Sequence, residues 1–80
     1  LKIAGTGTIN STTYKIGAIG GIKEKIPTAI DDGVDIFFCP KANYNEAYLK
    51  YESIKNHDRM KLVEVETLMD AINYLKEVSL

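Results

Sequence analysis

The chain has 80 residues, 45% hydrophobic and 26% charged, a composition typical of one small globular domain. Its formal net charge of -1 gives no electrostatic basis for binding nucleic acid. No apolar run is long enough to span a bilayer, and one cysteine excludes an internal disulfide. We expect residues 1–80 to form a single domain. Because the chain opens on Leu1 directly in a strand-like pattern, we expect it to be part of a longer protein.

The first twenty residues predict a β-hairpin. Residues 2–10 carry the threonine and isoleucine of a strand, although Gly5 and Gly7 weaken it and indicate a close backbone approach. A turn follows at residues 10–12, and residues 14–19 read as the second strand.

Residues 22–32 predict a helix, because their buried stripe recurs at helical spacing: Ile22, Ile26, Ala29 and Ile30. Pro27 is tolerated only in a first turn, so we expect the regular helix to start near Glu24 and to end at Gly33. Residues 34–39 are almost continuously apolar, which is typical of a strand covered on both faces. This strand, helix, strand order predicts a right-handed parallel crossover.

The rest of the chain predicts a helix, a short strand and a closing helix. Asn43 with Glu46 resembles a capping box. The stripe behind it is Tyr44, Ala47, Tyr48, Tyr51 and Ile54. Residues 60–65 alternate as a strand, and Thr67 with Asp70 caps a last helix with an apolar face: Leu68, Ala71, Ile72, Leu75 and Val78. The predicted class is α/β, an N-terminal β-hairpin followed by a β-α-β crossover, helix, short strand and C-terminal helix.

The candidate functional stretch is the double glycine Gly20-Gly21 followed by Lys23 and Lys25. Paired glycines allow a sharp turn into the helix. The positive end of a helix and burial both disfavour a charged ammonium, so either lysine is a candidate base. Helical spacing alone does not choose between the two, and two solvated surface lysines are the simpler interpretation.

Other chemistry has little support. His57 lies in a polar helix end beside Asp58, and Cys39 is expected to be a small buried hydrophobe. One cysteine and one histidine do not make a zinc site, so no metal is expected. The tyrosines at helical spacing indicate packing, and G-T-G-T lacks the lysine and helix start of a phosphate loop.

Three segments carry a family resemblance: A-G-T-G-T-I at 4–9, I-G-A-I-G-G-I-K-E-K at 16–25 and I-F-F-C-P at 36–40. They resemble the C-terminal half of the proteolytic domain of the Lon family of serine proteases. Within that family the first and last segments are most similar to the PDZ-domain-containing Lon-like proteases, which lack the ATPase part.

The resemblance implies a Ser-Lys dyad in which Lys25 is the base. Thr6 matches the threonine that holds the lysine amine, Gly7, Gly20 and Gly21 support the site, and Lys23 lies at the surface. The family uses no cofactor in this chemistry. Its serine lies in a P-S-A-G-type segment upstream, which none of the serines here matches: Ser11, Ser53 and Ser79. We therefore predict that the 80 residues alone are inactive, and a non-catalytic α/β interaction or assembly module is the alternative.

The resemblance also bears on partners and compartment. It implies a peptide or protein substrate, no nucleic acid, a possible homo-oligomeric ring and membrane attachment only through a region outside this sequence. A PDZ-type member would be bacterial, extracytoplasmic and membrane-anchored, whereas an ATP-dependent Lon would be cytoplasmic.

Overall fold

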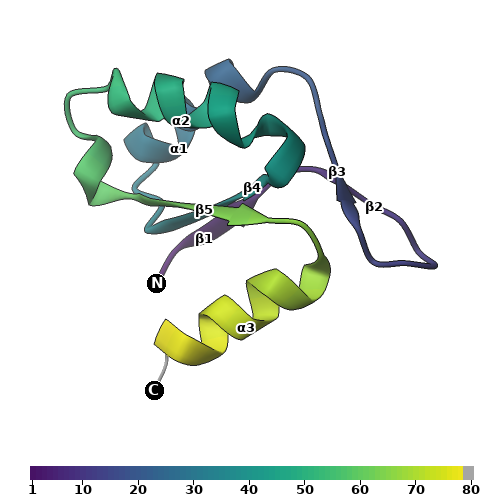
Figure 1. The fold of residues 1–80 in the computed structure, drawn as a ribbon. Coiled ribbons are helices and arrows are strands. Elements are labelled where there is room, and N and C mark those ends of the chain that lie inside the picture. The colour runs from purple at the N-terminus through teal and green to yellow at the C-terminus, as the bar shows by residue number, and fades with distance from the viewer. Residues whose placement is uncertain (79–80) are drawn as a thin grey trace.

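A three-stranded parallel sheet lies between two helical layers in the computed structural model, which describes residues 1–78 (Figure 1). The strands are β1 (Ile3–Gly5), β2 (Thr8–Ile9), β3 (Ile16–Gly17), β4 (Ile36–Pro40) and β5 (Lys61–Val65). The helices are α1 (Ile22–Asp31), α2 (Tyr44–Glu52) and α3 (Leu68–Val78), with short 3-10 turns η1 (Lys41–Asn43) and η2 (His57–Arg59). This confirms the predicted α/β class.

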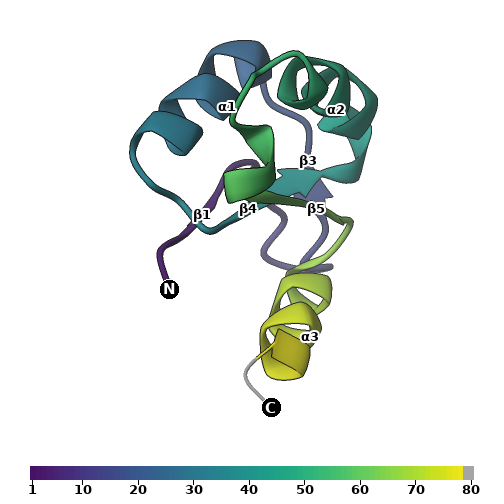
Figure 2. The ribbon, with the colours of Figure 1, turned by 90° about the vertical axis from the view of Figure 1, so that its left-hand side faces the viewer.

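The central strand of the sheet is β4, which pairs in parallel with β1 on one side and with β5 on the other. All five of its residues are buried, as the continuous apolar run predicts. Helices α1 and α2 cover one face of the sheet and α3 lies on the other (Figures 1 and 2). Each face has its own apolar cluster, with Phe37 of β4 in the first and Phe38 in the second.

The prediction for residues 2–10 is wrong in one respect, because they form two strands. β1 joins the main sheet beside β4, and only β2 pairs with β3 in a separate antiparallel hairpin. The crossover partner of β4 is therefore β1 and not the strand before α1. Gly7 makes the break, with φ at 130°, a conformation that L side chains rarely adopt.

Helix α1 begins at Ile22, two residues earlier than Pro27 suggested. Gly21 precedes it in the left-handed region at φ 73°, and its carbonyl accepts the N–H groups of Glu24 and Lys25 at 3.3 Å. Proline at the sixth position removes the donor for the Lys23 carbonyl. Lys23 itself is exposed.

The end of α1 is as predicted. Gly33 takes φ 78°, its N–H bonds to the Ile30 carbonyl, and the Val34 N–H bonds to the Ala29 carbonyl at 3.1 Å. This pair of bonds is a Schellman motif. It turns the chain directly into β4.

Of the caps predicted for α2 and α3, the first is wrong and the second is confirmed. The predicted capping box at Asn43 is wrong, since its side chain makes no capping bond to α2. At α3 the Asp70 carboxylate accepts the N–H groups of Glu66 and Thr67, and the Thr67 hydroxyl accepts the Asp70 N–H. Those backbone donors lower the pKa of Asp70, so the cap holds while the carboxylate is ionised and weakens as the pH falls through that pKa.

The apolar face of α3 is less covered than predicted. No residue of this helix is fully buried, and Val78 is 44% exposed. Ala71, Tyr74 and Leu75 pack on the sheet, and the Tyr74 ring meets that of Phe38 edge-on. No helix within residues 1–78 is long and apolar enough to cross a membrane.

We predict that Gly7→Ala destabilises the fold by about 1–3 kcal/mol. A Cβ there would lie 2.6 Å from Ile16 Cγ2 and 2.9 Å from Pro40 Cγ, at a φ that alanine disfavours. Gly20→Ala is the matched control, because nothing lies within 4 Å of its added Cβ. Urea unfolding followed by circular dichroism measures both, and equal midpoints for the two variants would contradict the prediction.

Candidate active site

Lys25 and Thr6 meet at the end of β1. The Lys25 Nζ donates a hydrogen bond to the Thr6 Oγ1 at 3.4 Å. Thr6 follows β1 directly, and its N–H bonds to the Phe38 carbonyl at 3.3 Å, which extends the parallel pairing by one residue. The contact joins the two residues that the sequence singled out, and it is made across 19 positions of the chain.

The position of each lysine on α1 explains why only one reaches β1. The buried stripe of α1 faces the sheet, with Lys25 four residues before the buried Ala29 and so beside that stripe. Lys23 lies on the other side, where it borders a groove formed with α2 residues such as Glu46 and Leu49. The structure therefore distinguishes the two lysines, whereas helical spacing alone did not: Lys25 contacts Thr6 and Lys23 lies beside α2.

An open groove of about 350 Å³ runs between β1 and α1 beside this contact. Its lining includes Ala4, Gly5 and Thr6 from the strand side and Glu24, Lys25 and Thr28 from the helix. Lys25 is exposed, so the residues described here do not bury its amine. The Thr28 hydroxyl is already used, because it donates to the Glu24 carbonyl at 3.0 Å.

The two serines described lie away from this groove. Ser11 is in the turn of the β2–β3 hairpin, and Ser53 follows α2, where its hydroxyl donates to the Lys50 carbonyl at 2.6 Å. Ser79 lies outside the described residues. Among the described residues, the groove therefore holds an amine hydrogen-bonded to a threonine hydroxyl, and no serine lines it.

The three glycines that the family resemblance assigns to the site have different surroundings. Gly21 supplies the left-handed turn that starts α1, and Gly7 lets the hairpin fold closely against Ile16 and Pro40. Gly20 has open space around it. Gly7 and Gly21, both at positive φ, set the direction of the chain next to Thr6 and before the helix turn that carries Lys25.

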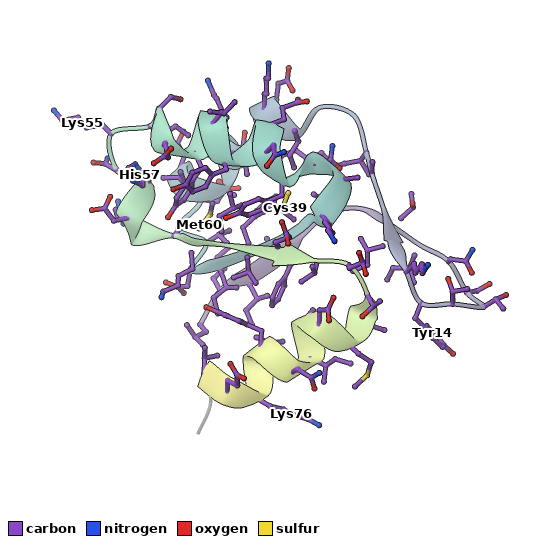
Figure 3. All side chains as sticks on the ribbon, viewed as in Figure 1. Tyr14, Cys39, Lys55, His57, Met60 and Lys76 are labelled. Carbon is purple, nitrogen blue, oxygen red and sulfur yellow. The ribbon has the colours of Figure 1, made fainter. Side chains whose placement is uncertain are left out.

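The residues that sequence reasoning set aside are structural. Cys39 is fully buried between the helices and the sheet, whereas His57 lies beside Met60 at one end of the molecule (Figure 3). The His57 Nδ1 is 2.8 Å from the Ile54 carbonyl, and its ring packs against that of Tyr51. No cluster of metal-binding side chains occurs among residues 1–78.

Asn43 is the residue that sequence reasoning misread. It is the buried polar side chain of the described core, at 8% exposure, and it bonds to the backbone of Ile19. Its position before α2 fits a helix cap, so the sequence pattern favoured that role instead. The signal for its burial was its place as a polar residue three positions after the fully apolar strand β4.

Comparison with known proteins places the chain in a family. A model of the Lon protease (S16) C-terminal proteolytic domain matches residues 1–77. The chain is 40% identical over 73 residues to a protein of Caenorhabditis briggsae described as Lon protease homolog 2, peroxisomal. That match covers 90% of this chain and 9% of the relative. No solved structure matches the chain significantly.

The α/β fold and the family match point to the proteolytic domain of a protease. The chain belongs to the Lon family and corresponds to the C-terminal proteolytic domain. The narrower resemblance to PDZ-containing proteases and a bacterial source gain no support from a nematode relative.

Burial raises the pKa of the Cys39 thiol from 9.0 to about 11, helped by the nearby Glu64 carboxylate. We predict that iodoacetamide at pH 8 labels the folded chain at least about 100-fold more slowly than the urea-unfolded chain. Mass spectrometry of timed samples measures both rates. Equal rates would show that Cys39 is accessible in the native state.

Proposed function

We propose that this chain supplies the lysine of a Ser-Lys dyad in a Lon-family serine endopeptidase, with Lys25 as the general base. The observation that supports the assignment is the hydrogen bond from Lys25 Nζ to Thr6 Oγ1. The chain spans 9% of its nematode relative, so a serine outside these 80 residues has ample room in the longer protein.

In the proposed reaction, a serine hydroxyl from the longer protein enters the groove between β1 and α1. The neutral Lys25 amine takes the hydroxyl proton as the oxygen attacks the carbonyl carbon of a peptide substrate. The resulting ammonium returns the proton to the leaving amine, and an acyl-serine forms. Water then attacks the acyl carbonyl carbon while Lys25 takes its proton. The bond to the serine oxygen breaks, the ammonium returns the proton to that oxygen, and the carboxylic acid is released.

Thr6 and α1 prepare the lysine for this role. The Thr6 hydroxyl holds the amine through an oxygen lone pair, which fixes its position without adding a negative charge. The first turn of α1 places the lysine side chain beside Thr6 and the groove. A serine-bearing segment seated on the groove would remove water from the amine, and burial favours the neutral form of a lysine.

We predict that Lys25→Ala in the longer protease lowers kcat/KM for a fluorogenic peptide by about 10³-fold or more. Lys25→Arg should fail equally, since a guanidinium does not deprotonate in proteins. Lys23→Ala is the matched control and should keep most activity, because Lys23 faces away from β1. A Lys25→Ala enzyme with near wild-type turnover would refute the assignment.

We also predict that the purified 80-residue chain cleaves no unstructured protein such as casein. Its described serines lie away from Lys25, and the base alone does not form an acyl-enzyme. Gel electrophoresis after long incubation, with a general protease inhibitor series to exclude contaminants, checks this. Cleavage that scales with chain concentration and disappears in Lys25→Ala would contradict it.

A further inference from the structure

Asn43 stands out because the oxygen and the nitrogen of its buried carboxamide both bond to a single residue of a loop 24 positions earlier. Its Oδ1 accepts the Ile19 N–H at 2.9 Å, and its Nδ2 donates to the Ile19 carbonyl at 2.9 Å. A buried amide without partners would be costly, so this pairing satisfies both groups. The side chain thus accepts from the N–H and donates to the carbonyl of the same residue, as the backbone of a paired strand does.

The loop held in this way is the segment between β3 and α1, residues 18–21. It contains both glycines of the double-glycine turn, and Gly20 has no packing partner for an added Cβ. Glycine gives such a loop many alternative conformations. The two bonds from Asn43 to Ile19 therefore restrict a segment that has little packing of its own.

The last residue of this loop, Gly21, is the N-cap of α1. The Gly21 carbonyl accepts the N–H groups of both Glu24 and Lys25, so the turn that carries Lys25 is bonded directly to the loop. The Lys25 Nζ to Thr6 Oγ1 distance of 3.4 Å is already long for a hydrogen bond. A shift of the first turn away from β1 would lengthen it further.

We infer that Asn43 is a positioning residue for the lysine base, an inference that rests on the proposed function of Lys25. Asn43 does not touch the groove. It acts through Ile19 and Gly21, by fixing where α1 begins and so where the Lys25 amine lies relative to Thr6. Displacement of a catalytic group by about 1 Å can cost about 100-fold in rate, so a modest loosening should be measurable.

The requirement for an amide makes the inference specific. An aspartate at position 43 has the same shape, but its two oxygens are both acceptors and one would face the Ile19 carbonyl. A serine is too short to reach both groups. Asn45 lies in the first turn of α2 and is exposed, so the same substitutions at position 45 serve as matched controls.

The first test is amide hydrogen exchange in the 80-residue chain carrying Asn43→Asp, Asn43→Ser, Asn45→Asp or Asn45→Ser. We expect the Asn43 variants to exchange Ile19, Glu24 and Lys25 amides at least about tenfold faster than the wild type. The Phe37 amide of the central strand reports global unfolding, so it should accelerate by a clearly smaller factor than these three amides. The Asn45 variants should match the wild type throughout.

The second test is peptidase kinetics of the same variants in the longer protease. The Asn43 variants should lose at least about tenfold in kcat with KM within about twofold, while the Asn45 variants keep both. Asn43→Ser keeps the test open if Asn43→Asp does not fold.

Three results would overturn the inference: wild-type exchange at Glu24 and Lys25, equal acceleration at Phe37, or wild-type kcat in a variant with a loosened turn. An active Lys25→Ala enzyme would instead refute the proposed function. The exchange data would still show whether Asn43 fixes the start of α1.

Discussion

The parallel pairing of β1 with β4 is the constraint on which the candidate site depends. Side chains alternate along a strand, and Ala4 packs into the cluster beneath α1 and α2. The same alternation places Thr6, two residues on, toward α1, and its N–H bond to Phe38 continues the pairing to that point. Any slip of β1 by one residue would turn the Thr6 hydroxyl to the opposite face.

Much of the fold was predictable because it is specified locally. The five buried residues of β4, the glycine that ends α1 and the Thr67–Asp70 cap of α3 each depend on residues close in sequence. The Lys25–Thr6 contact was also predicted, although the family resemblance and not helical spacing distinguished Lys25 from Lys23. Spacing places both lysines beside the buried stripe and does not say which side faces β1.

The predictions that failed depend on distant residues. Gly7 divides the predicted first strand into β1 and β2. A glycine in a strand pattern does not reveal that β1 will pair with β4, in which Ile36, the partner of Ile3, lies 33 residues further along the chain. Asn43 has the local pattern of a cap and uses its amide on Ile19, 24 positions earlier. The exposure of Val78 likewise depends on how much of α3 the sheet covers, which periodicity does not give.

The assignment of Lys25 as the base is best tested by a crystal structure of the longer protease that contains this chain. We expect Lys25 Nζ to lie within hydrogen-bond distance of both Thr6 Oγ1 and a serine Oγ seated in the groove between β1 and α1. A structure with the Lys25 amine in open solvent, and the active serine hydrogen-bonded to another base, would contradict it.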